Sequence, residues 1–239
     1  MNIVDLSQKG SRAFLNWSGG KDAAFALFQI RKTEGISVER LLTTVGEKTK
    51  RVAMHAVREE LVKAQAVSIG IPLDILYLPE NPDMETYEQR MLLKMKGYRD
   101  QGLTTSVFGD INLQDLRRYR ENQLEKVGME ALFPLWDNQP GIQAKNFIEA
   151  GFKAIVVSVN AALMDESYVG ADFDRAFLDR LPLGVDPCGE NGEFHTFVYD
   201  GPLFNFPIAF TPGEKVFWEY PSGPSNPESN YSLWQIEIR

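Results

Sequence analysis

The chain has 239 residues, of which 44% are hydrophobic and 24% charged, and this balance excludes disordered and fibrous proteins. The net charge of −8 argues against broad nucleic-acid binding. Cys188 is the only cysteine, which excludes an intrachain disulfide and is typical of a reducing compartment, most simply the cytoplasm.

The apolar runs are short, and the N-terminal residues lack the pattern of a signal peptide. Runs such as 154–159 and 206–210 fall far below the roughly 20 residues that a membrane-spanning helix needs. We therefore expect a cytoplasmic protein without a membrane segment. A homo-oligomer is compatible with these features.

Residues 1–130 alternate short apolar runs with longer stretches of helical period, the pattern of a parallel sheet covered by helices. The expected strands are Arg12–Trp17, Val38–Val45, Leu73–Leu78 and Thr104–Phe108. The expected helices are Lys21–Thr33, Val52–Ile69, Asp83–Gln101 and Asn112–Val127. This order predicts a doubly wound α/β domain whose loops after successive strands gather at one edge of the sheet, where such sheets bind ligands.

The pattern changes after Gly128, and we predict a second, smaller α+β domain over residues 131–239. Helices are expected at Gln139–Gly151 and Asp172–Leu181, with a strand between them at Phe152–Val159. Segments rich in Pro, Gly, Ser and Asn then separate four further strands, at Glu193–Tyr199, Phe206–Phe210, Lys215–Tyr220 and Ser232–Ile238. Pro221–Asn230 is expected to be a long, mobile loop.

The segment Ser18–Asp22, with the sequence SGGKD, lies between the first expected strand and the first expected helix. Gly19 and Gly20 allow a positive φ and bring bare N–H groups to an anion, to which the helix N-terminus adds its partial positive charge. Ser18 would supply a hydroxyl, Lys21 a positive charge and Asp22 a carboxylate for Mg²⁺. The alternative is a plain glycine turn, but the flanking strand and helix favour a phosphate-binding loop. It is not a Walker loop, because GxxxxGK[ST] fails at both ends.

The stretch from Glu190 to His195 places two carboxylates and an imidazole within six residues. Glu193 and His195 would share one face of a strand, where they could orient or deprotonate an incoming ammonium ion. The alternative is a polar turn that leads into an edge strand. The residues alone leave both interpretations open.

SGGKD after the first strand resembles the PP-loop of the N-type ATP pyrophosphatases, which have the adenine nucleotide α-hydrolase (HUP) fold. In that superfamily the loop holds the β- and γ-phosphates of ATP as a leaving pyrophosphate. The resemblance therefore implies ATP and Mg²⁺ as cofactors, with Lys21 as a catalytic residue and Asp22 at the metal. It also implies that backbone groups at Thr43, Thr44 and Val45, at the end of the second strand, meet the adenine.

Further stretches narrow the resemblance: Gly109-Asp110-Ile111, PLW at 134–136, DPCGENGEFHTF at 186–197 and DGPLF at 200–204. Together they resemble the diphthine–ammonia ligase family. The resemblance implies an ATP-dependent amidation, in which a carboxylate attacks the α-phosphate and ammonia then displaces AMP. It places Glu190, Glu193 and His195 in the acceptor site as catalytic residues. Gly109 and Asp110 stand at the end of the fourth expected strand, beside the expected nucleotide crevice, where Asp110 would contact the nucleotide or a metal. The implied acceptor is diphthine on translation elongation factor 2, with another carboxylate substrate as the alternative.

Two other functions remain as alternatives: a PP-loop enzyme that acts on tRNA, and an ATP-binding regulator without catalysis. Thiolation of tRNA usually needs paired cysteines and a basic surface, which this sequence lacks. A regulator would not need the acidic stretch in the second domain. His55 and the arginines at 117, 118 and 120 are more simply surface residues, and Cys188 a structural one.

Overall fold

The computed structural model describes residues 10–52, 57–80, 82–220 and 231–239. His55 and the predicted loop Pro221–Asn230 therefore lie outside the described residues. Within the described part, no helix is long and apolar enough to cross a membrane.

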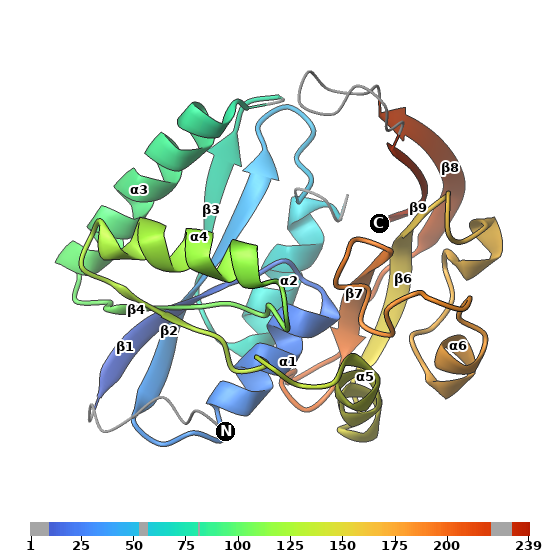
Figure 1. Cartoon of the computed structure of the whole chain (residues 1–239), viewed down its shortest axis with the longest axis horizontal. Helices are drawn as coiled ribbons and strands as arrows, with labels where there is room; N and C mark the ends of the chain where they lie inside the picture. The colour runs from blue at the N-terminus through green and yellow to red at the C-terminus, as the bar shows by residue number, and fades with distance from the viewer. Residues whose placement is uncertain (1–9, 53–56, 81, 221–230) are drawn as a thin grey trace.

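Five parallel strands form the first sheet, in the order β3-β2-β1-β4-β5 (Figure 1). The strands are β1 (Ser11–Asn16), β2 (Ile36–Gly46), β3 (Leu73–Leu78), β4 (Thr105–Val107) and β5 (Glu130–Leu132). The helices that connect them are α1 (Lys21–Ile30), α2 (Glu59–Ile69), α3 (Met84–Asp100) and α4 (Gln114–Glu125). The predicted doubly wound α/β sheet is thus confirmed. The strand order reverses between β1 and β4, which makes the crevice beyond these two strands the expected ligand site.

Side chains of β1 alternate between the two faces of this sheet, as the period of two in a strand requires. Phe14 belongs to the apolar cluster that contains Met91 of α3 and Leu124 of α4, whereas Leu15 belongs to the cluster that contains residues of α1 and α2. Helices α1 and α2 also contact the second domain through one continuous apolar cluster, which includes Phe152. These two helices therefore lie between the first sheet and the second domain.

The second domain contains an antiparallel sheet in the order β7-β6-β9-β8. Its strands are β6 (Lys153–Asn160), β7 (Phe194–Asp200), β8 (Pro212–Tyr220) and β9 (Tyr231–Ile238), and its helices are α5 (Pro140–Glu149), η1 (Glu166–Tyr168) and α6 (Arg175–Asp179). The predicted smaller α+β domain is confirmed in kind. The expected division between the two domains, after residue 130, falls inside β5. The exact boundary therefore stays a prediction.

The strand predicted at Phe206–Phe210 is wrong, because this segment forms no strand. The Phe206 N–H donates to the Ser68 hydroxyl (3.1 Å), and the Ile208 N–H donates to the Tyr199 carbonyl (2.7 Å). Pro207 between them has no N–H to give to a ladder. The segment therefore binds to α2 and to the end of β7 instead of extending a sheet.

Candidate active site

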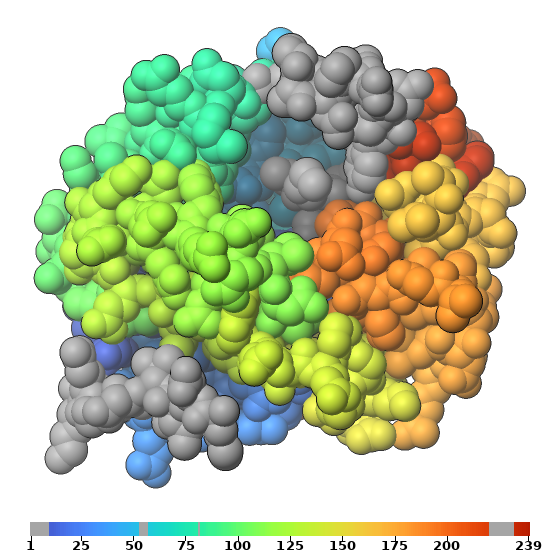
Figure 2. Space-filling view, in the orientation of Figure 1, coloured from blue at the N-terminus to red at the C-terminus, as the bar shows by residue number. Residues whose placement is uncertain are grey.

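A cleft of about 720 Å³ opens beyond the carboxyl ends of β1 and β4, and its far wall comes from the second domain. In the space-filling view the molecule is hollowed between the first domain and the segment around β7 (Figure 2). Ligand pockets typically measure about 300–1,000 Å³, so the cleft has room for a nucleotide. Among the predicted site residues, those that line it are Ser18, Lys21, Asp22, Gly109, Asp110, Glu190 and His195.

The SGGKD segment forms a tight loop into α1. Gly19 has a φ of +81°, and a Cβ there would lie 2.9 Å from Oε1 of Gln65, so both the conformation and the space require glycine. Gly20 is the N-cap of α1 with a φ of −90°, so a positive φ is needed at Gly19 alone. The Gly20 N–H donates to the Ser18 hydroxyl (3.2 Å). The helix therefore starts at the cleft, with its positive dipole end directed at the expected phosphates.

Gln65 of α2 holds this loop in place, a role that the sequence analysis missed. Its Oε1 accepts from the Trp17 indole N–H (2.9 Å), and its Nε2 donates to the carbonyls of Gly19 (3.0 Å) and Val198 (2.6 Å). The side chain is fully buried. A buried amide that is this completely hydrogen-bonded rigidifies its surroundings. The available signal was a glutamine beside Leu61, Val62 and Ala66 on the buried stripe of a helix.

Lys21 joins the loop to the second domain. Its ammonium donates to the Asp22 carboxylate (2.7 and 2.8 Å) and to the Cys188 carbonyl, and its backbone N–H donates to the Thr196 hydroxyl (3.0 Å). Burial disfavours the charged form of Lys21, but the Asp22 carboxylate and other nearby negative groups outweigh it and hold the pKa above its ordinary value. The side chain is therefore a charged ammonium, positioned between the loop and the second domain.

Gly109 and Asp110 follow β4 on the other side of the strand-order reversal. A Cβ on Gly109 would lie 2.8–2.9 Å from backbone atoms of Asp22 and Ala23, so only glycine lets this turn approach the start of α1. The Asp110 carboxylate forms an ion pair with Arg120 of α4 (2.6 Å). Burial raises the pKa of Asp110, Arg120 opposes this shift, and the charge of Asp22 adds to it.

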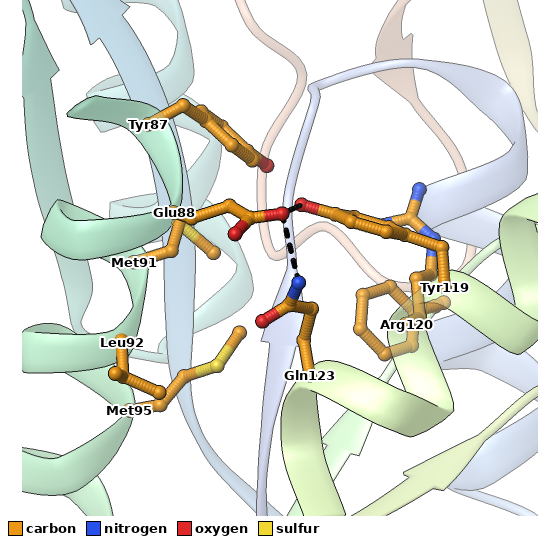
Figure 3. A pocket seen from close by; sticks show the side chains of 9 residues that line it. Tyr87, Glu88, Met91, Leu92, Met95, Tyr119, Arg120 and Gln123 are labelled. Atoms are coloured by element: carbon orange, nitrogen blue, oxygen red, sulfur yellow. Dashed lines mark hydrogen bonds between the residues drawn. The ribbon is translucent and has the colours of Figure 1, made fainter. Parts of the chain in front are cut away.

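A second, smaller pocket adjoins the cleft between α3 and α4, and Arg120 lines both (Figure 3). Glu88 accepts hydrogen bonds there from the Tyr119 hydroxyl (3.1 Å) and the Gln123 amide (2.8 Å). Burial, followed by this hydrogen bond, raises the pKa of Tyr119 to about 12. Tyr119 is therefore a neutral hydrogen-bond donor at physiological pH. The Arg120 side chain forms part of the wall between pocket and cleft.

Glu190 reaches across the cleft from the second domain. Its Oε1 accepts from the backbone N–H groups of Ile111 (2.8 Å) and Asn112 (3.3 Å), just after β4. Burial raises the pKa of this carboxyl to about 7, and the charges of Asp22 and Asp110 contribute to the shift. Glu190 is therefore poised to gain or lose a proton near neutral pH, as a general acid or base requires.

Glu193 lies in a different position from the one expected. Strand β7 begins one residue later, at Phe194, and the Glu193 carboxylate turns into its own loop instead of sharing a face with His195. It accepts from the backbone N–H groups of Asp186 (3.2 Å) and Asn191 (2.9 Å) and from the Asn191 amide (3.1 Å). His195 lines the cleft, whereas Glu193 organises the 186–191 loop behind it.

The side chains of Thr43 and Val45 also do not line the cleft. The Thr43 hydroxyl donates to the Trp17 carbonyl (2.6 Å), and Val45 is fully buried in the apolar cluster on the α1–α2 side. Leu42 and Thr44 line the cleft from this strand. A contact between the adenine and the backbone at Thr43, Thr44 and Val45 stays a prediction.

Besides burial, the negative charge of Asp22 raises the pKa of Asp110, and the charges of Asp22 and Asp110 both raise the pKa of Glu190. Within the described ranges, no group of three or more His, Cys, Asp or Glu side chains has the geometry of a metal site. Mg²⁺ usually binds one or two carboxylates together with substrate phosphates, so a protein-only cage is not needed. Asp22, which is partly exposed in the cleft beside the loop, fits this manner of binding.

The pKa of Glu190 gives a prediction for stability. The folded state holds this proton up to about pH 7, whereas the unfolded state loses it near 4.5, so burying the carboxyl costs more as the pH rises between these values. Glu190→Gln keeps an acceptor oxygen for the Ile111 N–H but never ionises. We expect the melting temperature of the variant, relative to wild type, to rise by a few degrees between pH 5 and 8 in calorimetry. A difference that is constant with pH would contradict the raised pKa.

The N-terminal domain of the diphthamide synthase family matches residues 11–131, and the C-terminal domain of that family matches residues 139–227. The chain belongs to the diphthamide synthase family. The diphthine–ammonia ligase of Danio rerio is 29% identical over 229 residues, which cover 83% of this chain and 86% of that protein. The enzymes of the same name from Bos taurus (32%) and Homo sapiens (31%) match over 110 residues, 44% of this chain and 41% of theirs. The predicted family is confirmed.

Proposed function

We propose that the chain is an ATP-dependent ligase that adenylates a carboxylate and amidates it with ammonia, releasing AMP and pyrophosphate. One observation carries this proposal: a glycine loop at a helix start faces the Glu190 carboxyl across a single cleft, at the strand-order reversal. Its relatives named diphthine–ammonia ligase support the amide-forming chemistry.

In the first step the acceptor carboxylate attacks the α-phosphorus, and the bond between the α-phosphorus and the bridging oxygen of pyrophosphate breaks. Negative charge then develops on pyrophosphate, where the N–H groups at the start of α1 and the Lys21 ammonium can stabilise it. Lys21 is held at this point by Asp22 and the Cys188 carbonyl. Mg²⁺ beside Asp22 would neutralise further phosphate charge.

In the second step ammonia attacks the carbonyl carbon of the acyl adenylate, the amide bond forms, and AMP leaves. The ammonium ion must first lose a proton. Glu190, with a pKa of about 7, can accept it at neutral pH, and His195 lines the same wall. The relatives' names point to diphthine as the acceptor. The resemblance described above implies that elongation factor 2 carries it, and another carboxylate in its place would leave the two steps unchanged.

The products test the proposal. We expect incubation with Mg-ATP, ammonium and acceptor to yield AMP and pyrophosphate in equal amounts, measured by chromatography and a pyrophosphate assay. Lys21→Met should reduce this turnover by about 10²-fold or more, the size expected when one donor to developing charge is removed. Lys126→Met is the matched control, because this exposed lysine hydrogen-bonds Gln123 away from the cleft. Stoichiometric ADP would overturn the proposal.

A further inference from the structure

Strand β8 is an edge of the second sheet, because in the described part of the chain it pairs with β9 alone. Every residue from Pro212 to Glu219 is exposed. An edge strand presents a row of free backbone donors and acceptors, and natural proteins usually keep such edges short, charged or covered. A fully exposed edge of this length is therefore a candidate for pairing with another strand.

The centre of β8 is apolar. Val216 is 39% exposed, Phe217 44% and Trp218 52%, although the Phe217 ring also contacts the Trp234 ring of β9 at 5.0 Å between centroids. Three consecutive exposed apolar side chains on an edge strand mark an interaction surface.

We propose that β8 pairs antiparallel with β8 of a second copy of this chain, about a twofold axis at Phe217. In this register Lys215 lies opposite Glu219 of the second copy, and Val216 lies opposite Trp218. Among the described residues, the Lys215 ammonium hydrogen-bonds the Glu166 carbonyl, and its charge also acts on Asp165, whereas Glu219 forms no ion pair. Opposite charges and paired apolar side chains across antiparallel strands both stabilise the pairing.

Other registers fit the strand less well. A register centred between Val216 and Phe217 places Glu214 opposite Glu219, which is repulsive. One centred between Glu214 and Lys215 also pairs a lysine with a glutamate. However, it brings Pro212, which has no N–H, into the ladder and leaves Trp218 beyond its end. The twofold axis at Phe217 is thus favoured by charge and by apolar contact together.

A cysteine pair tests this register directly. Across the proposed axis the two Phe217 Cα atoms would lie about 4.5–5.5 Å apart, within the range of a disulfide. The two Lys215 Cα atoms would lie roughly 14 Å apart. Phe217→Cys should therefore give a covalent dimer on non-reducing gels after mild oxidation, and Lys215→Cys should not. Cys188 is buried and does not compete. Equal cross-linking of both variants, or of neither, would overturn the register.

A charge exchange tests the contact independently. In sedimentation equilibrium we expect wild type to reach twice the chain mass of 27.0 kDa. Lys215→Glu and Glu219→Lys should each weaken the dimer by about tenfold or more, because each change acts twice across the axis. Combining them in one chain should restore wild-type association. All variants should bind ATP equally, because β8 does not line the cleft. A monomeric wild type, or a double variant no better than the single ones, would refute the proposal.

Discussion

Gly109→Ala should lower the affinity for Mg-ATP by about 10- to 100-fold. The added Cβ would lie 2.8–2.9 Å from the backbone of Asp22 and Ala23, and this contact is relieved only if the start of α1 and the turn after β4 move apart. Such a movement would misalign the N–H groups and the Lys21 ammonium with the phosphates. Each charge-assisted contact is worth about 1.5–3 kcal/mol, so the loss of one accounts for the expected effect. Titration calorimetry with Mg-ATP measures it.

Gly97→Ala is the matched control for this change. Gly97 lies inside α3, and a Cβ there would meet no atom within 4 Å. Alanine should stabilise the helix by about 0.5–1 kcal/mol and leave the ATP affinity unchanged. If Gly109→Ala also bound Mg-ATP with wild-type affinity, the turn after β4 would not determine the position of the Ser18–Asp22 loop.

The fold was predictable where the pattern is local and regular. The β3 segment Leu73–Leu78 is confirmed to the residue, and the expected SGGKD loop does lie between β1 and α1. Strand β5 has only three residues, Glu130–Leu132, so its alternation was too short to identify. Phe206–Phe210 has the apolar character of a strand, but its backbone hydrogen bonds go to Ser68 of α2 and Tyr199 of β7. Ser68 is distant in the sequence, so the local pattern could not reveal this contact.

The same limit applies to the site. The Ser18–Asp22 loop was predictable because a strand, two glycines and a helix start are adjacent in sequence. The hydrogen bonds of Gln65 to Gly19 and Val198 join residues 46 and 133 positions apart, which a single sequence does not reveal. Glu193 was misplaced for a local reason: β7 begins one residue later than expected, so Glu193 lies in the preceding loop, where the alternation of a strand does not set the direction of its side chain.

Glu193→Gln should reduce amide formation by about 10²-fold or more without Glu193 touching the substrate. Its carboxylate accepts hydrogen bonds at both oxygens, from Asp186 and from Asn191. A glutamine amide would turn a donor toward one of these N–H groups, which costs about 1–3 kcal/mol and displaces the loop that carries Glu190. Removing a general base lowers the reaction rate by about 10²–10⁴-fold, so displacing the Glu190 carboxyl should lower the rate by an amount that approaches this range.

A double-mutant cycle distinguishes positioning from direct catalysis. If Glu193 acts by holding Glu190, then Glu193→Gln should slow the Glu190→Gln enzyme very little, because the group that it positions is already inactive. If Glu193 were itself a base, the two losses would multiply. The pH profile gives a second measure: the limb near pH 7 that comes from Glu190 should shift in Glu193→Gln, since a displaced carboxyl loses the burial that raises its pKa. If the two losses of turnover multiply and the limb of the pH profile near pH 7 does not shift, Glu193 itself takes part in the chemistry.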